Sequence, residues 1–160
     1  PNNDFMWRYD MRRLSAEEIR DSILNLTGKL NLKMGGPSIY TEVPRDVLAT
    51  ASRPGGAWGN SSEEDRNRRS VYIFVKRSLH EPFLSAFDWA DTDNTCDVRF
   101  VTTVPTQTLT LMNSKFLNDS AETLAKYVAE VAPGDATAQI RHALHKATHR
   151  KPTDEEVQDG

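Results

Sequence analysis

Apolar residues recur at the spacing of an amphipathic helix in several stretches of the chain. The first stretch begins at Ser15, which stands three residues before Glu18, the arrangement of a capping box. Its apolar stripe consists of Ile19, Ile23, Leu24 and Leu26. This pattern predicts a helix from Ser15 to about Thr27, which Gly28 ends. Earlier in the chain, the spacing of Trp7, Met11 and Leu14 predicts another helix that ends near Arg13.

The last third of the chain predicts a series of helices. Pro105 suits a first helical position, and from the third position Gln107 can bond back to the backbone N–H of Val104. This helix is either kinked or divided at Asn113–Ser114, and its continuation ends near Val131. Asp135 then caps a helix to about His149, and the capping-box spacing of Thr153 and Glu156 starts one more. The expected inward positions are Leu109, Met112, Phe116, Leu117, Ala121, Leu124, Val128, Ile140, Ala143, Leu144 and Ala147.

The middle of the chain has a different pattern. Residues 35–67 hold five glycines, three prolines and no sustained period, which predicts a long irregular loop with a helical turn near Arg45 to Ala49. Ser70 to Lys76 and Asp97 to Val104 are short and rich in β-branched and aromatic residues, so each predicts a strand. A short helix from Pro82 to Trp89 separates them. The expected fold class is mainly α: a bundle-like helical fragment with a long irregular loop and a possible two-stranded β element.

Composition sets limits on this picture. A chain of 160 residues suits one domain, but its 38% hydrophobic fraction and mean hydropathy of −0.61 are low for a self-sufficient core. We therefore expect residues 1–160 to be a single domain cut from a larger multidomain protein. The net charge of −3 argues against nucleic acid as a partner. No apolar run approaches the roughly 20 residues of a membrane span.

Two groups of residues raise the question of a metal site. His142, His145 and His149 share one helical face, but they are spread over two turns and converge poorly on one zinc ion, so an exposed face is expected. An acidic loop holds Asp88, Asp91, Asp93, Asn94 and Asp97, at a spacing that partly matches calcium ligands. The loop lacks the glycine and glutamate of an EF-hand, so Asx turns that cap its own backbone are the preferred interpretation. No metal or other cofactor is predicted.

Basic residues gather between Arg66 and Arg77. Guanidinium groups beside Tyr72 and Trp58 could bind an anionic group. However, the carboxylates of the preceding SSEED stretch favour a local salt-bridge network. Arg12, Arg13 and Arg20 are expected to pair on the helix surface with Glu17, Glu18 and Asp21. Cys96, the one cysteine, is expected to be a buried thiol. No catalytic sequence motif is present, which leaves any enzymatic activity uncertain.

Several stretches, in this order, resemble the PSD domain family, a domain of unknown function at the C-terminus of planctomycete cytochrome-c-associated proteins. They are WRYDMRRLSAEEIRDSIL, MGGPSIY, RRSVYIFVKRSL, PFLSAFDWADTDNTCDVRFVTTVPTQTLTLMN and ATHRKPTDEEV. The resemblance covers about Trp7 to Val157. It implies an extracytoplasmic location and haem only in a separate domain, and it implies no established reaction. One departure is His149, where many relatives have a glycine that ends the helix.

Two functions from different classes follow from these features. The first is a non-catalytic module that docks neighbouring domains of the same polypeptide or binds an anionic polysaccharide through its arginines. The alternative is an enzymatic domain that acts on polysaccharide with an Asp/Arg cluster, which for glycoside hydrolysis requires carboxylates such as Asp88 and Asp91 roughly 5–10 Å apart across a cleft. The candidate binding residues are Arg69, Tyr72, Lys76, Arg77, Asp88, Asp91, Asn94 and Arg99; the catalytic residues are unknown.

Overall fold

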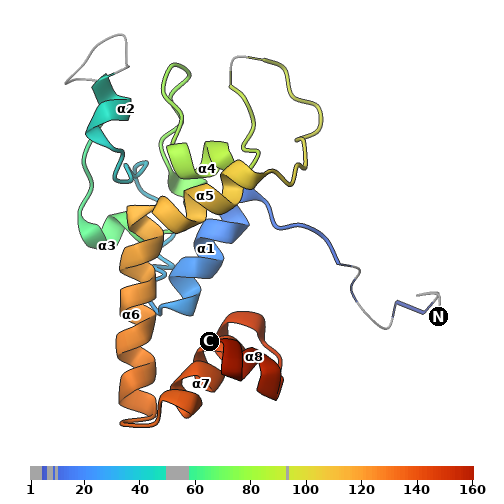
Figure 1. Cartoon of the computed structure of the whole chain (residues 1–160). Helices are drawn as coiled ribbons and strands as arrows, with labels where there is room; N and C mark the ends of the chain where they lie inside the picture. Colours follow the sequence, from blue (N-terminus) through green and yellow to red (C-terminus); the bar gives the residue numbers. More distant parts are fainter. Residues whose placement is uncertain (1–4, 7–8, 10, 50–57, 93) are drawn as a thin grey trace.

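The computed structural model describes residues 5–6, 9, 11–49, 58–92 and 94–160, and this part of the chain is mainly helical (Figure 1). The expected fold class is thereby confirmed. The helices are α1 (Ala16–Leu26), α2 (Arg45–Ala49), α3 (Glu63–Arg66), the 3-10 turn η1 (Ser70–Tyr72), α4 (Pro82–Ala86), α5 (Pro105–Asn113), α6 (Lys115–Val131), α7 (Ala136–Thr148) and α8 (Asp154–Asp159). β-Structure in the described residues is limited to three isolated bridges, Asn31–Arg68, Ile39–Ile73 and Lys76–Leu79.

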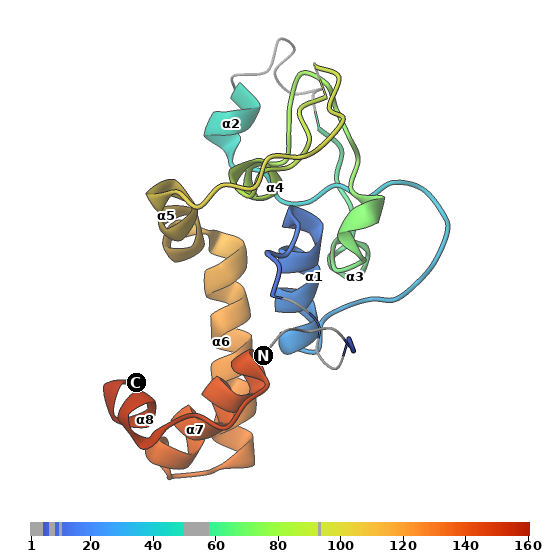
Figure 2. The same ribbon diagram turned by 90° about the vertical axis from the view of Figure 1, so that its right-hand side faces the viewer.

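Helix α1 is the centre of the packing. It contacts η1, α4 and α6, while α5 contacts α4 and α6 (Figures 1 and 2). The far end of α6 carries α7, which in turn packs against α8. No helix in the described ranges is both long enough and apolar enough to cross a membrane.

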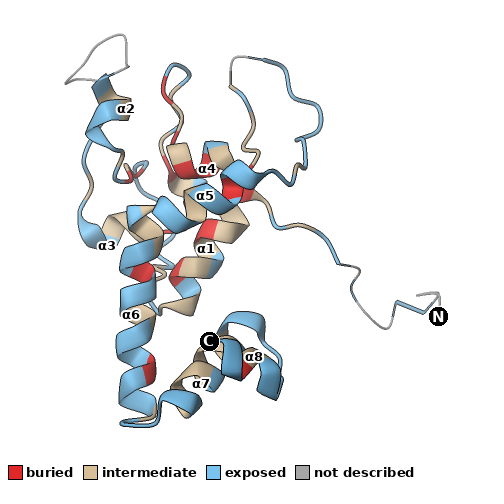
Figure 3. Ribbon diagram, in the orientation of Figure 1, coloured by how far each residue is buried: buried red, intermediate tan, exposed pale blue. Residues whose placement is uncertain are grey.

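The main hydrophobic core is small and lies where α1 meets α4. Its buried side chains come from α1, α4 and two loop segments: Ala16, Ile39, Ile73, Phe83, Leu84 and Phe87. Phe116 at the start of α6 closes it, with its ring edge against Phe83 at 5.5 Å between centroids. Figure 3 shows how few positions are buried outside this region. The low hydrophobic fraction of the sequence is therefore matched by a core of limited extent.

A buried arginine joins α1 to the segment that precedes η1. The side chain of Arg20 is only 4% exposed. Its guanidinium donates to the carbonyls of Arg66 at 2.5 Å and Arg68 at 3.2 Å and to Ser70 Oγ at 3.1 Å. The next residue, Asp21, accepts hydrogen bonds from both the backbone N–H and the hydroxyl of Ser70, at 2.7 and 2.6 Å. The surface pairing expected for Arg20 is wrong, because this side chain binds backbone carbonyls in the interior.

The loop over residues 33–37 is organised by a second buried arginine. Arg68 is 2% exposed and donates to the carbonyls of Lys33, Gly35 and Pro37. Its guanidinium lies over the Tyr72 ring, 4.0 Å from the centroid, which adds a cation–π contact. The irregular loop expected in this region is therefore held by side chains rather than by regular secondary structure.

Local sequence signals give the helix ends correctly. Ser15 and Glu18 form the expected capping box of α1, and Thr153 and Glu156 form that of α8. Gln107 Oε1 accepts from the Val104 N–H at 3.4 Å, and Ser114 divides α5 from α6. Asp135 caps α7, and His149 ends it in a left-handed conformation with φ of 55°. His149 thus takes the backbone conformation in which glycine would be free of strain.

Three sequence predictions fail for identifiable reasons. Ser70–Tyr72 forms a 3-10 turn instead of a strand, because Arg20 and Asp21 fix Ser70. The segment from Asp97 to Val104 is also not a strand, and its Thr102 binds Asp88 instead of a neighbouring strand. The described residues from Met11 to Ser15 lie outside any helix, and Trp7 lies outside the described part of the chain. The short helix α3 was not predicted, although the Ser62–Asp65 cap is visible in the sequence.

The buried Glu81 caps α4. Its side chain accepts from the Leu84 N–H at 2.7 Å and from the Thr41 hydroxyl at 3.4 Å, and the residue is 5% exposed. Burial raises the pKa of Glu81 above its ordinary value of 4.5, although the Leu84 N–H and the charge of Arg20 favour the ionised form. The net effect is that folding favours the protonated carboxyl group.

Arg20→Met should lower the free energy of unfolding by about 3 kcal/mol, since it leaves three buried acceptors without a donor. Chemical denaturation measures this loss. Arg12→Met is the matched control because Arg12 pairs with Glu18 on the exposed surface, and it should change stability little. Equal losses from the two substitutions would contradict the structural role given to Arg20.

Glu81→Gln should change the pH dependence of stability. A raised folded pKa stabilises the protein fully below the unfolded value of 4.5, and this contribution is lost as the pH rises through the folded pKa. The unfolding free energy of the wild type should therefore fall relative to that of Glu81→Gln between pH 4 and pH 8. Denaturant titrations across this range test the sign. Glu64→Gln on the exposed side of α3 is the control, and a constant difference for Glu81→Gln would refute the prediction.

Candidate functional site

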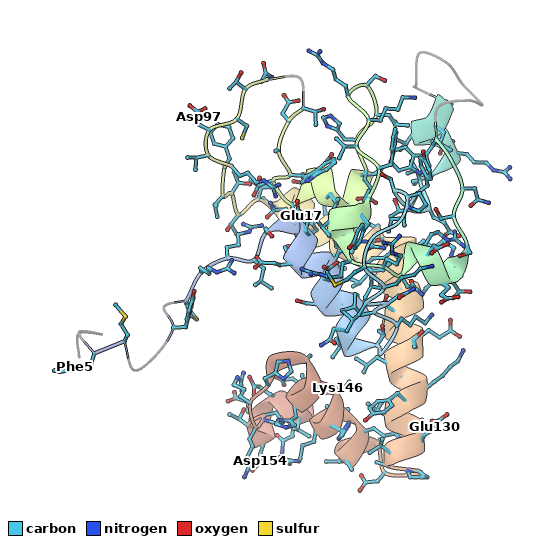
Figure 4. All side chains as sticks on the ribbon, turned by 180° about the vertical axis from the view of Figure 1, so that it is seen from behind. Phe5, Glu17, Asp97, Glu130, Lys146 and Asp154 are labelled. Carbon is cyan, nitrogen blue, oxygen red and sulfur yellow. The ribbon has the colours of Figure 1, made fainter. Side chains whose placement is uncertain are left out.

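The predicted binding residues lie in two separate segments. Arg69, Tyr72, Lys76 and Arg77 belong to the stretch around and after η1, whereas Asp88, Asp91, Asn94 and Arg99 belong to the loop between α4 and α5. Figure 4 shows this loop projecting from the helical body, with Asp97 on its outer part and Glu17 of α1 at its base. Each segment has its own set of contacts.

The arginines of the first segment are engaged in structural contacts. Arg69 lies 3.6 Å from the Asp21 carboxylate, and Arg66 lies 2.6 Å from that of Glu42. Tyr72 lies beneath the guanidinium of Arg68 and accepts from the Gly35 N–H at 2.9 Å. Arg66 and Arg69 thus form salt bridges, as the sequence suggested, but the salt bridges are not the local ones that were expected. The Arg66 and Arg69 partners come from residues distant in the sequence, rather than from the neighbouring SSEED stretch.

Asp88 is the anchor of the second segment. It has a positive φ of 62°, and its carboxylate accepts from the Thr102 N–H at 2.9 Å and the Thr102 hydroxyl at 2.7 Å. The amide of Gln107 adds a longer contact at 3.4 Å. Partial burial opposes ionisation, but these hydrogen bonds and the nearby charge of Arg13 outweigh it and lower the pKa of Asp88. The side chain is therefore an ionised acceptor at neutral pH.

Arg13 extends this network to the chain before α1. Its guanidinium donates to Gln107 Oε1 at 2.7 Å and to Thr103 Oγ1 at 3.0 Å. The expected pairing of Arg13 with an acidic residue on the surface of α1 is wrong, because these hydrogen bonds reach across to α5 and the loop before it. Arg12 makes the expected pair with Glu18 at 2.6 Å. Hydrogen bonds from Arg12 and Ser15 lower the pKa of Glu18 to about 2.

A second group of contacts holds the loop near its two ends. Arg99 donates to both carboxylate oxygens of Glu17, at 2.9 and 2.7 Å, and Trp89 Nε1 donates to Glu17 Oε1 at 3.0 Å. Partial burial is the largest single influence on Glu17, but the bonds from Arg99 and Trp89 together lower its pKa. His80 lies edge-on to Trp89 and 2.8 Å from Thr92 Oγ1. The loop is thus tied to the body near both of its ends.

The metal candidates do not assemble in the described residues. Asn94 donates to Asp91 Oδ2 at 2.6 Å, a bond between two side chains rather than the expected capping of the backbone, and Asp93 lies outside the described residues. On α7, His142 faces the Tyr127 ring and His145 Nδ1 lies 2.9 Å from the Arg150 carbonyl. Within the described ranges, no group of three or more His, Cys, Asp or Glu side chains is placed to hold an ion.

Two open hollows on the surface of the described residues have volumes of about 340 and 330 Å³. The first lies between residues 37–40 and 60–68, and the second lies beside α1 with Asp21 and Arg69 in its lining. Asp88, Asp91 and Arg99 line neither. The acidic and basic candidates therefore do not converge on either of these hollows, and their assignment as binding residues stays a prediction.

The chain matches the PSD1 family, described as a protein of unknown function (DUF1553), over residues 1–160. It belongs to this family. The resemblance to the PSD domain family, which the sequence stretches show in their order along the chain, is thereby confirmed. Comparisons with curated proteins and with solved structures gave no match.

One surface feature of this PSD1 chain was not predicted. Large apolar side chains are exposed along the loop before α5 and on α5 itself, and we call them the 98–112 apolar surface: Val98, Phe100, Val101, Val104, Leu109 and Met112. Val98 and Phe100 are 81% and 82% exposed. Their apolar, β-branched or aromatic character indicated a strand, and Leu109 and Met112 were expected to face inward. Cys96, expected to be buried, is also exposed.

Asp88→Asn should loosen the loop while the PSD1 fold is retained. Asparagine tolerates a positive φ but lacks the second acceptor oxygen and the negative charge that hold Thr102. Amide hydrogen exchange at Thr102, followed by NMR, should become several times faster. Asp97→Asn, an exposed change in the same loop, is the control and should leave Thr102 unaffected. Unchanged exchange at Thr102 in Asp88→Asn would mean that the carboxylate does not hold the loop.

Proposed function

We propose that this PSD1 chain is a non-catalytic docking domain that binds a neighbouring domain of the same polypeptide through the 98–112 apolar surface. The observation that carries the proposal is the orientation of the loop before α5. Its polar residues are held by hydrogen bonds, Arg99 to Glu17 of α1 and Thr102 to Asp88 at the start of the same loop, while Val98 and Phe100 are exposed to solvent. A segment whose Arg99 and Thr102 side chains are held by hydrogen bonds, while the apolar side chains beside them face solvent, fits a surface that another protein covers.

Docking also fits the energetics of this surface. Burial of a large apolar side chain contributes roughly 1.5–3 kcal/mol, so a few such residues at the centre of an interface suffice to drive association. The contacts of Asp88 and Glu17 hold the loop in place before a partner arrives. Such preorganisation reduces the entropy lost on binding.

The arginine contacts support docking over binding of an anionic polysaccharide. Arg66 and Arg69 already have carboxylate partners, and Arg68 is buried against backbone carbonyls. An anionic glycan would have to compete with these partners. The enzymatic alternative needs two carboxylates that face each other across a cleft, and neither Asp88 nor Asp91 lines the two hollows.

The setting follows from the sequence resemblance. We place this docking domain in a larger exported protein of the planctomycete, cytochrome-c-associated type, where the haem belongs to a separate domain. In that arrangement the neighbouring domain supplies the apolar surface that covers Phe100 and Met112. The module would then organise its polypeptide rather than carry out a reaction.

The test compares hydrogen exchange in this chain alone and in the longer protein that contains it. Amides of residues 97–112 should exchange more slowly in the longer protein, because the neighbouring domain covers them. The double substitution Phe100→Ser and Met112→Ser should remove most of this protection. Mass spectrometry of peptic fragments provides the measurement.

The matched control is Met34→Ser with Leu32→Ser, which removes two apolar side chains of comparable exposure, 85% and 68%, from another loop. This control should leave the protection intact. Equal exchange of residues 97–112 in the two proteins would refute docking through this surface. Equal loss of protection in both double variants would show a general effect of apolar side chains and would also refute it.

A further inference from the structure

We propose that the loop segment from Arg99 to Thr103 binds its partner by β-strand addition, and that the partner contributes an extended strand with apolar residues flanked by lysine or arginine. This inference rests on the proposed docking function and specifies how the same surface is recognised. It differs from simple apolar contact because it assigns the main role to backbone hydrogen bonds.

The backbone of this segment is available for pairing. No backbone–backbone hydrogen bond joins residues 97–103 to any other described residue. Residues 99–104 contain neither helix nor bend, and Val104 is extended, with φ of −127° and ψ of 148°. An exposed segment with unpaired N–H and C=O groups is a template for a further strand.

The side chains of the segment favour a strand, and its attachment to the body leaves one edge open. Phe100, Val101 and the following threonines have high β-propensity, yet no strand lies beside them in the part of the chain that the structure describes. In an extended backbone, successive N–H groups point to opposite edges. The Thr102 N–H points to Asp88, so the N–H groups of Arg99, Val101 and Thr103 belong to the other edge. That edge is the one we assign to the partner.

Charge indicates which strand fits. Residues 88–98 contain four aspartates and no lysine or arginine. Asp97, two residues before Arg99, is exposed on the outer part of the loop (Figure 4). A partner strand with cationic flanks would be attracted to this acidic loop. A second copy of the chain would bring two acidic loops together, which disfavours self-pairing.

The experiment uses the ¹⁵N-labelled chain and the synthetic peptide KKVTVTVKK as the probe. Saturable shifts are expected in the amides of residues 98–103, with slowed exchange at Arg99, Val101 and Thr103 and little change at Thr102. The same peptide with alternate backbone nitrogens methylated on one edge should bind about tenfold more weakly, because it cannot donate the pairing hydrogen bonds. Equal affinity of the plain peptide and both N-methylated edge variants would overturn strand addition.

Matched proline substitutions test the same edge from the side of the protein. Val101→Pro removes an N–H from the proposed pairing edge, whereas Val98→Pro makes the same chemical change in the bend just before the segment, outside the proposed pairing. Both valines are exposed, at 71% and 81%, so neither substitution removes core packing. Peptide affinity should fall about tenfold for Val101→Pro and stay near the wild-type value for Val98→Pro. Equal effects of the two prolines would overturn the proposal.

The outcomes separate this inference from the docking function beneath it. If residues 97–112 are protected in the longer protein but N-methylation and Val101→Pro have no effect, docking stands and strand addition fails. If the peptide gives no saturable shift at millimolar concentration, the assignment of a strand partner is wrong. If residues 97–112 are not protected in the longer protein, the docking function itself fails.

Discussion

The packing around α1 depends on the buried guanidinium of Arg20. Removing a charged side chain from water is costly, and it is tolerated only where the surroundings supply enough hydrogen-bond acceptors. Here the acceptors are two backbone carbonyls and a hydroxyl between Arg66 and Ser70. Desolvation lowers the pKa of Arg20, and the charges of Glu81 and Asp21 oppose that shift. The connection between α3 and η1 is in this way fixed to α1.

The same helix positions the loop that carries the proposed interface. Glu17, Arg20 and Asp21 lie at i, i+3 and i+4, so they project from neighbouring places on α1. Arg20 and Asp21 hold the segment before and within η1, while Glu17 holds Arg99 and Trp89. These three polar residues of α1 thus fix the positions of the exposed loop before α5 and of the partly buried segment around η1. The interface can be rigid although it contains no sheet and little core.

The 98–112 apolar surface is exposed because polar contacts occupy the inner side of the same segment. Thr102 and Gln107 donate hydrogen bonds to the Asp88 carboxylate, and Arg13 donates hydrogen bonds to Gln107 and Thr103. Because these polar groups occupy the inner side of the segment, its valines and phenylalanine are left on the outer side. Docking through this surface would complete the burial that the small core of the chain does not provide.

The sequence by itself determined the features that depend on neighbours within one helical turn. The capping residues Ser15, Asp135 and Thr153, the proline at the start of α5 and the break at Ser114 all act over three or four residues. Tertiary structure decided the rest, because those features depend on partners distant in the sequence. Arg20 is buried only because the carbonyls of Arg66 and Arg68 reach it, and Asp97 to Val104 is not a strand because none of the described residues forms a second strand beside it. Propensity favours a conformation for a segment, but a strand forms only when another backbone takes its hydrogen bonds.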